Sequence, residues 1–203
     1  MSIIMEEGLV HVYTGTGKGK TTSSLGLALR AVGHNLKACM IQFLKSGDTG
    51  ELFAVEKYVP NIKIIQCGRE ALDEKQLKIF GFEKEKEKQH ENKLTEDEVY
   101  VFLPDEEEKE ACRRGLELAK RVVMSGEFDL VILDEINCTL DKNLIEVREV
   151  LELIKQKPRH VELVLTGRGA PQELMDVADY VSEIKRVKHP YDRGILARKG
   201  IEY

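Results

Sequence analysis

A glycine-rich segment, Gly15-Thr16-Gly17-Lys18-Gly19-Lys20-Thr21-Thr22, constrains this chain more than any other part of its sequence. The apolar run before it, residues 8–14, predicts a β-strand, and the apolar residues after it recur at helical spacing from Lys20 to Val32. Between a strand and a helix, such glycines let backbone N–H groups turn inward, and the helix N-terminus adds partial positive charge. The segment therefore predicts binding of the phosphates of a nucleoside triphosphate, and ATP is the one we expect.

The loop departs by one residue from the standard phosphate-binding pattern. Lys20 is expected on the terminal phosphates and the Thr21 hydroxyl on Mg²⁺. The standard pattern places a glycine at the position of Thr14, whereas the leading glycine here is Gly15, so the loop is one residue shorter. Lys18 adds a second cation. A tight turn without a ligand is the alternative, but such a turn has no need of the lysine and the two threonines.

The other apolar runs predict strands that alternate with helices. We expect strands at residues 37–44, 61–66, 128–135, 160–166 and 180–187, and helices at about 105–124, 144–154 and 172–177. Nearly continuous apolar strands separated by helices are typical of a mostly parallel sheet that is covered on both faces. The expected fold is therefore a single α/β domain, residues 1–203, with about six strands. A charged excursion at about residues 68–104, with alternating charges at 83–88, is expected to be solvated.

Two carboxylates, Asp134 and Glu135, end the strand expected at residues 128–135. Ligands of open α/β sheets collect at the carboxyl ends of the strands, where the glycine-rich segment also lies. Proteins with a phosphate-binding loop keep at such a position the acid that completes the Mg²⁺ shell. A helix cap is the alternative role, but the occurrence of the pair together with the loop favours the metal site.

Composition argues against several other classes of protein. No run of eighteen apolar residues occurs, and the first seven residues lack the features of a signal peptide, so we expect no membrane span and a cytoplasmic location. The 31 basic residues are outnumbered by 36 acidic ones, which argues against a nucleic-acid partner. The cysteines form no C-x-x-C pair, which argues against a structural zinc site, and we expect reduced thiols.

Several motifs, taken in order, resemble those of one family, the ATP:corrinoid adenosyltransferases that make adenosylcobalamin. The short loop is similar to that family's own variant of the phosphate loop. The other similar segments are Arg30–His34, Ile41–Lys45, Leu133–Glu135, Thr166–Pro171, Ala178–Glu183 and Val187–Asp192. The resemblance covers roughly residues 8–66 and 105–203, and several motifs in order are more specific than any one of them.

The resemblance implies a P-loop (RecA-like) NTPase type of fold and a transferase. The reaction it implies is transfer of the 5′-deoxyadenosyl group of ATP to the Co(I) centre of a reduced corrinoid, with release of triphosphate, in adenosylcobalamin biosynthesis or salvage. Reduced cobalt is itself a strong nucleophile, so the protein need supply only positioning and stabilisation of the leaving group. A homodimer and a cobalt-reducing flavoprotein partner are implied as well.

Carried over to this sequence, the resemblance assigns roles to named residues. The phosphate contacts fall on Gly15, Thr16, Gly17, Lys18, Gly19, Lys20, Thr21 and Thr22. Thr21 and Glu135 are the expected Mg²⁺ ligands, with Asp134 next to them. Lys20 and Glu135 are the expected catalytic residues, and Arg168 is expected to reach the nucleotide.

One departure from the family concerns the corrinoid pocket. Family members carry a Gly-Phe-Thr-Trp motif after the third strand, and its aromatic residues crowd the lower face of the corrin. This chain has no tryptophan and has Gly68-Arg69-Glu70 at that place. Four aromatic residues could substitute, although an ordinary core role is the alternative for each: Phe80, Phe82, Tyr100 and Phe102. The sequence therefore supports the ATP half of the assignment better than the corrinoid half.

Two other functions could use the same loop. The first is a small-molecule kinase or NTPase, in which Asp134 and Arg168 would act as base and transition-state arginine. The second is an ATP-dependent binding module without chemistry, in which the charged excursion docks a partner. The products distinguish them, because a kinase releases ADP and a binding module consumes no ATP.

Overall fold

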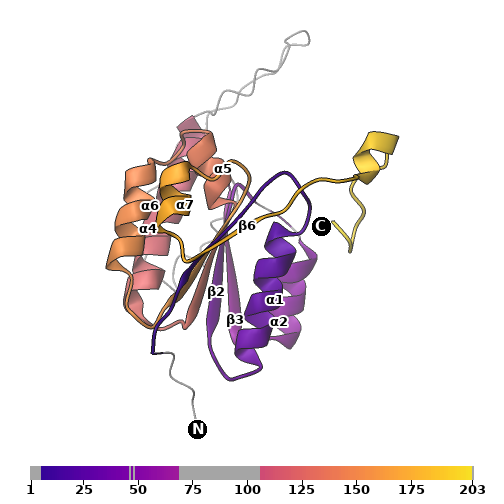
Figure 1. The fold of residues 1–203 in the computed structure, drawn as a ribbon. Helices are drawn as coiled ribbons and strands as arrows, with labels where there is room; N and C mark the ends of the chain where they lie inside the picture. The colour runs from indigo at the N-terminus through magenta and orange to yellow at the C-terminus, as the bar shows by residue number, and fades with distance from the viewer. Residues whose placement is uncertain (1–5, 46, 48, 69–105, 203) are drawn as a thin grey trace.

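Six parallel strands form one sheet in the computed structural model, which describes residues 6–45, 47, 49–68 and 106–202. In chain order the strands are β1 (Val10–Thr14), β2 (Ala38–Phe43), β3 (Ile62–Cys67), β4 (Leu130–Asp134), β5 (Glu162–Thr166) and β6 (Tyr180–Glu183). Their order across the sheet is β3-β2-β4-β5-β1-β6. Figure 1 shows this sheet between two groups of helices, with β2, β3 and β6 labelled. One strand, β5, thus separates the strand that precedes the glycine-rich loop from the strand that ends in Asp134.

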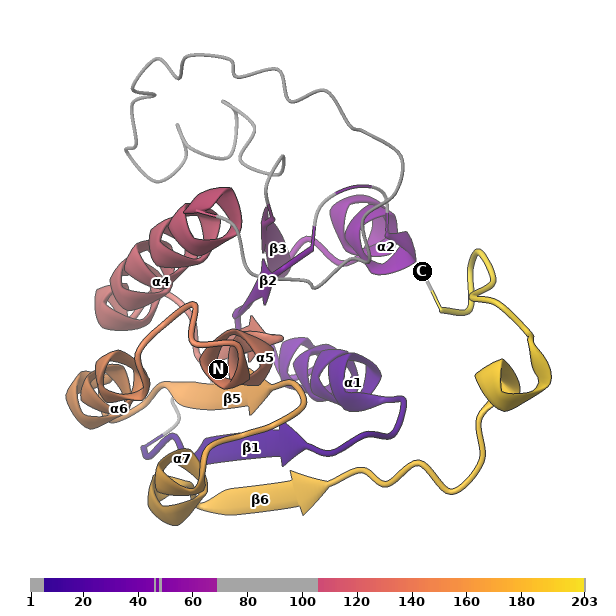
Figure 2. The same ribbon diagram turned by 90° about the horizontal axis from the view of Figure 1, so that it is seen from above.

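Helices cover both faces of this sheet, as Figure 2 shows. On one face lie α1 (Lys20–Val32) and α2 (Gly50–Tyr58), and on the other lie α4 (Glu106–Ser125), α6 (Val147–Gln156) and α7 (Gln172–Val177). A short helix, α5 (Ile136–Asp141), follows β4 directly, and a 3₁₀ turn, η1 (Pro190–Arg193), lies in the C-terminal segment. None of the helices within the described ranges is both long and apolar enough to cross a membrane.

The strands contribute side chains to two apolar cores, one on each face of the sheet, because successive side chains of a strand point to opposite faces. From β2, Cys39, Ile41 and Phe43 join the core under α4, whereas Met40 joins the core under α1 and α2. All residues of β2 and all residues of β4 are buried. This burial on both faces explains why the central strands read as continuous apolar runs.

The predicted α/β class, the parallel sheet and its two covered faces are confirmed. The helices at residues 20–32 and 172–177 have the predicted bounds. The short helices α2 and α5 were not predicted, and helix α6 begins at Val147 rather than at residue 144. Apart from Gly68, the charged excursion lies outside the described residues, as do the four aromatic candidates for the corrinoid pocket.

Helix α4 packs very closely on β2 and β3 at Gly115. A Cβ atom at Gly115 would lie 2.8 Å from Cε1 of Phe43 and 3.0 Å from Cβ of Cys67. Both of these side chains are fully buried, so neither has free space into which it could move. The absence of a side chain at Gly115 thus sets how near the helix comes to the sheet.

We predict that Gly115→Val destabilises the fold by overpacking this contact. The free energy of unfolding, measured by chemical denaturation, should fall by about 1–3 kcal/mol. Gly26→Ala is the matched control, because Gly26 is an exposed glycine of α1 whose added Cβ would meet no atom within 4 Å. That variant should gain about 0.5–1 kcal/mol from helix propensity. Equal stability of Gly115→Val and the parent protein would contradict the packing argument.

Candidate functional site

The glycine-rich loop connects β1 to α1 at the carboxyl edge of the sheet. Gly15 and Gly19 have φ angles of 97° and 120°, a region that side-chain-bearing residues rarely adopt. Gly19 is the residue before the first turn of α1, which begins at Lys20. The free N–H groups of that first turn and the positive end of the helix dipole therefore lie at the loop, as phosphate binding requires.

The chain that leaves β6 supports the loop from behind. The backbone N–H of Gly17 donates to the carbonyl of Ile184 at 2.7 Å. A Cβ atom at Gly15 would lie 2.5 Å from that same carbonyl oxygen, and one at Gly17 would lie 2.8 Å from it. Packing against Ile184 therefore requires a glycine at both positions, and the φ angle of Gly15 requires one there as well. The sequence alone did not reveal this packing requirement.

Lys20 places its ammonium group inside the loop. Its Nζ donates to the carbonyls of Gly15 and Gly17, both at 2.8 Å, and the residue is only 7% exposed. Burial lowers the pKa of Lys20 below its ordinary value, and the negative charge of Glu135 opposes that shift. The group predicted to contact the terminal phosphates is therefore held at the centre of the loop.

Asp134 is a fully buried carboxylate with four hydrogen-bond donors around it. Its Oδ1 accepts from the hydroxyls of Thr21 at 2.8 Å and Thr166 at 2.7 Å. Its Oδ2 accepts from Nζ of Lys45 at 2.7 Å and, more weakly, from Nε2 of Gln42 at 3.3 Å. The structure thus brings the predicted Thr21 hydroxyl directly onto the carboxylate that ends β4.

Glu135 holds an unusual backbone conformation next to that carboxylate. Its φ of 63° lies in the left-handed region, and its N–H donates to the Thr166 hydroxyl at 3.1 Å. Its own carboxylate accepts a hydrogen bond from Sγ of Cys138 at 2.7 Å. A non-glycine residue in this region costs on the order of 1–3 kcal/mol and tends to mark functional sites. Since Thr21 contacts Asp134 rather than Glu135, the metal role of Glu135 stays a prediction.

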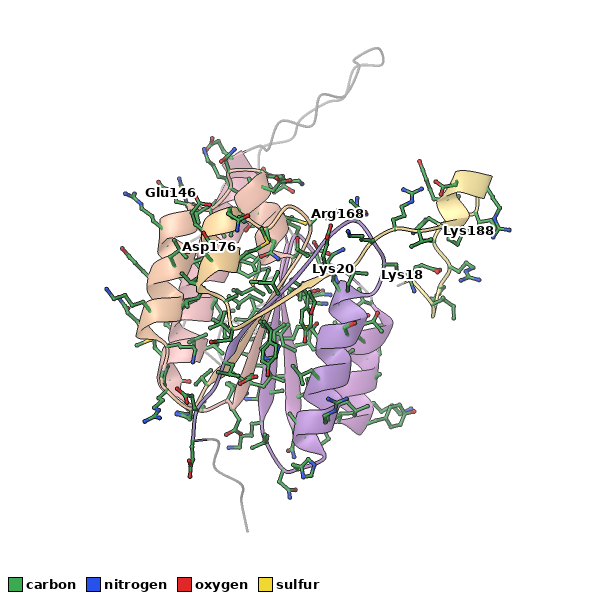
Figure 3. All side chains as sticks on the ribbon, viewed as in Figure 1. Lys18, Lys20, Glu146, Arg168, Asp176 and Lys188 are labelled. Atoms are coloured by element: carbon green, nitrogen blue, oxygen red, sulfur yellow. The ribbon has the colours of Figure 1, made fainter. Side chains whose placement is uncertain are left out.

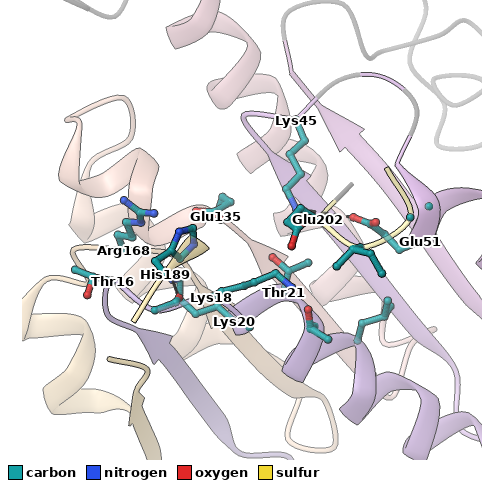
Figure 4. A pocket seen from close by; sticks show the side chains of 17 residues that line it. Thr16, Lys18, Lys20, Thr21, Lys45, Glu51, Glu135, Arg168, His189 and Glu202 are labelled. Carbon is teal, nitrogen blue, oxygen red and sulfur yellow. Dashed lines mark hydrogen bonds and ion pairs between the residues drawn. The ribbon is translucent and has the colours of Figure 1, made fainter. Parts of the chain in front are cut away.

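A cavity of about 480 Å³ opens over the loop (Figure 4). Its volume lies in the range of ordinary small-ligand sites. The lining residues are Thr16, Gly17, Lys18, Gly19, Lys20, Thr21, Thr22, Leu25, Lys45, Gly50, Glu51, Glu135, Arg168, His189, Gly200, Ile201 and Glu202. Every residue that the sequence placed in the site is among them except Gly15, which lies one position before the lining, and Asp134, which is fully buried beneath it.

Cations dominate the side of the cavity nearest the loop. Figure 3 shows Lys18, Lys20 and Arg168 at the same edge of the sheet, and Lys45 joins them in the lining. Charged donors of this kind, together with a helix N-terminus, suit a polyphosphate. The arrangement is therefore compatible with the predicted nucleotide.

Sequence reasoning missed the C-terminal part of the lining. His189, Ile201 and Glu202 reach the cavity from a segment far along the chain from the loop. Hydrogen bonds from Arg198 lower the pKa of Glu202 to about 2, so this carboxylate is ionised. The motif that contains His189 was noted in the sequence, but no spacing rule connects it with the glycine-rich loop.

The residues beside the loop fit a magnesium ion that is shared with phosphate oxygens. Mg²⁺ prefers oxygen ligands and usually takes only one or two of them from the protein. The Thr21 hydroxyl and the carboxylate of Asp134 provide such oxygens 2.8 Å apart, and Glu135 lines the same cavity. Within the described residues no group of three or more histidine, cysteine, aspartate or glutamate side chains could hold a metal ion alone.

The cysteines of this chain are poor nucleophiles. Burial raises the pKa of each of the four thiols, those of Cys39, Cys67, Cys112 and Cys138, to about 12. For Cys138 the hydrogen bond to Glu135 adds to the effect of burial. Because the thiolate is the reactive form, none of these residues is suited to attack a substrate at neutral pH.

We predict very slow alkylation of Cys138 in the native protein. At about pH 8, a pKa near 12 leaves roughly one thiolate in ten thousand, against about a quarter for an ordinary thiol. Iodoacetamide labelling followed by mass spectrometry should therefore be at least about a hundredfold slower than in urea-unfolded protein. The rate should rise about tenfold per pH unit, because a raised pKa keeps the thiol protonated.

Glu135→Ala should speed the labelling of Cys138 and leave that of Cys39 unchanged, because the carboxylate raises the pKa of Cys138 alone. Equal labelling rates of Cys138 in native and unfolded protein would show that its pKa is not raised.

Comparisons with known proteins point in one direction. The sequence model of the family described as ATP:corrinoid adenosyltransferase BtuR/CobO/CobP matches residues 6–203, a range that includes the whole cavity lining. The corrinoid adenosyltransferase of Escherichia coli (strain K12) is 30% identical over 199 residues, which cover 98% of this chain and 87% of that protein. The corrinoid adenosyltransferase CobA of Salmonella typhimurium is also 30% identical, with the same coverage. That of Sinorhizobium sp is 34% identical, over 98% of this chain and 81% of that protein.

Proposed function

This chain belongs to the ATP:corrinoid adenosyltransferase family, and we propose that it transfers the 5′-deoxyadenosyl group of ATP to the Co(I) centre of a corrinoid and releases triphosphate. The observation that carries the proposal is the cavity over the shortened loop, with Lys20 inside the loop and the Thr21–Asp134 pair beside it. The reaction would serve adenosylcobalamin biosynthesis or salvage.

In the proposed reaction the protein must position ATP and stabilise the negative charge of the leaving triphosphate. The electron pair of Co(I) forms the bond to C5′, and the C5′–O bond breaks so that its electrons leave on the triphosphate. Lys20 and the N-terminus of α1 would hold the negative leaving group, with Lys18 and Arg168 at the same cavity. Such preorganised donors stabilise the transition state because negative charge grows where they already point. No protein nucleophile is needed, in keeping with the protonated thiols.

We propose Mg²⁺ as the cofactor, held by Thr21 and Glu135 with the carboxylate of Asp134 against the Thr21 hydroxyl. When bound, the ion would neutralise part of the charge on the triphosphate. Asp134 would keep the Thr21 oxygen oriented toward the ion through its 2.8 Å hydrogen bond. From the family resemblance alone we further propose a homodimer, a cobalt-reducing flavoprotein partner and a cytoplasmic location.

The direct test is to supply ATP, Mg²⁺ and chemically reduced cobalamin and to identify both products. We expect a light-sensitive Co–C product and an equal amount of triphosphate, which phosphorus NMR distinguishes from ADP and phosphate. ADP or phosphate in place of triphosphate would support the kinase or NTPase alternative. Binding of ATP without any consumption would support the binding module.

We predict that Lys20→Ala lowers kcat/KM for ATP by at least about a hundredfold, because a buried cation on the leaving group is lost. Lys18→Ala is the control from the same loop, since Lys18 is exposed. Its loss should stay below about tenfold, as for a solvent-screened charge. Thermal unfolding of both variants verifies that they are folded. Near-normal turnover by folded Lys20→Ala would remove the loop from the mechanism.

A further inference from the structure

Lys45 is a cation that lines the cavity, and it has no role in the proposed reaction. Its Nζ lies 2.7 Å from Oδ2 of Asp134 and 3.9 Å from Oε1 of Glu51. Figure 4 shows its side chain extending into the site from the segment after β2. It is thus an ammonium group within reach of two carboxylates.

The charge of Asp134 requires a counter-ion, because its side chain is fully buried. The hydroxyls of Thr21 and Thr166 and the amide of Gln42 hydrogen-bond to it, but they are neutral. An uncompensated buried charge is strongly destabilising, by an amount that exceeds what neutral donors normally return. Lys45 therefore supplies the positive charge that this carboxylate needs.

A metal ion bound at Thr21 would lie against the same carboxylate. The Thr21 hydroxyl and Lys45 approach different oxygens of Asp134, Oδ1 and Oδ2. Two cations on one carboxylate repel each other, and the repulsion is large where water is excluded. Metal binding therefore favours withdrawal of the ammonium group from Asp134.

Glu51 offers the ammonium group a second position. Nε2 of Gln42 donates to Oε1 of Glu51 at 3.1 Å and to Oδ2 of Asp134 at 3.3 Å, so one amide joins the two carboxylates. Gln66 donates to Oε1 of Gln42 at 3.1 Å and fixes the orientation of that amide. The flexible Lys45 side chain thus has a short path from one carboxylate to the other.

We propose that Lys45 is the resident counter-ion of Asp134 and competes with Mg²⁺ for the negative charge of that carboxylate, and that Mg²⁺·ATP moves its ammonium group toward Glu51. This inference rests on the proposed function, because it takes the cavity as the ATP site. Free Mg²⁺ meets a competing cation there, whereas Mg²⁺·ATP brings phosphate oxygens that help to hold the ion. Lys45 thereby makes metal binding depend on the nucleotide.

The test uses Mn²⁺ alone as the probe, followed by electron paramagnetic resonance, with no ATP and no corrinoid. Lys45→Met removes the charge and keeps a flexible side chain, so Mn²⁺ should bind at least about tenfold more tightly. Glu51→Gln removes the second position and keeps the ammonium group on Asp134, so Mn²⁺ should bind more weakly. Lys57→Met removes an exposed charge of α2 that does not line the cavity and should change nothing.

The double variant separates this competition from a general effect of nearby charge. If Glu51 acts through Lys45, then Lys45→Met with Glu51→Gln should bind Mn²⁺ within about twofold of Lys45→Met alone. Additive effects of the two changes would overturn the proposal, as would unchanged Mn²⁺ affinity in folded Lys45→Met.

Thermal unfolding gives a second measurement. Lys45→Met should melt at a lower temperature than the parent protein and should regain more stability on addition of Mn²⁺. If Lys45→Met does not fold, the Mn²⁺ affinity of Glu51→Gln tests the proposal by itself, since an unchanged affinity in that variant would overturn it. Failure of adenosyl transfer in the product assay would overturn the proposed function but would leave these metal-only measurements intact, so the two failures are distinguishable.

Discussion

The buried carboxylate of Asp134 is the constraint on which the rest of the site depends. It ends β4, and the strand order places β2 on one side of it and β5 on the other. Gln42 pairs with it in register from β2, and the hydroxyl of Thr166 reaches it from β5. The Thr21 hydroxyl reaches it from α1. One buried carboxylate thus links the start of α1 to the two strands that flank β4.

The proposed chemistry follows from the groups that the site provides for binding an anion and from the absence of a reactive thiolate among its cysteines. The loop presents a buried lysine and a helix N-terminus, which stabilise a negatively charged leaving group. The thiols stay protonated, because burial raises the pKa of each to about 12. A protein of this kind is suited to hold an anion firmly while the acceptor supplies the nucleophile, and that division of labour is the basis of the proposed adenosyl transfer.

The part of the site that the sequence predicted is the local part. The turn from β1 into α1 could be predicted because glycine spacing and helical periodicity are properties of residues that are close in sequence. The buried strands could be predicted because each is a continuous apolar run. The contacts of Lys45 and Glu202 could not be predicted, because they depend on how distant segments of the chain pack together. Helix α5 could not be predicted either, because six residues are too few to show a helical period. The corrinoid side of the assignment rests on aromatic residues outside the described ranges and stays a prediction.

Adenosyl transfer requires that the C5′–O bond of ATP breaks while the loop holds the phosphates. Mass spectrometry of the products formed from ATP labelled with ¹⁸O at the 5′ bridging oxygen tests it most directly. Adenosyl transfer should send all of the label into triphosphate, because the electrons of the broken bond go to that oxygen. Label retained in ADP would show that a bond to phosphorus breaks instead, and it would contradict adenosyl transfer.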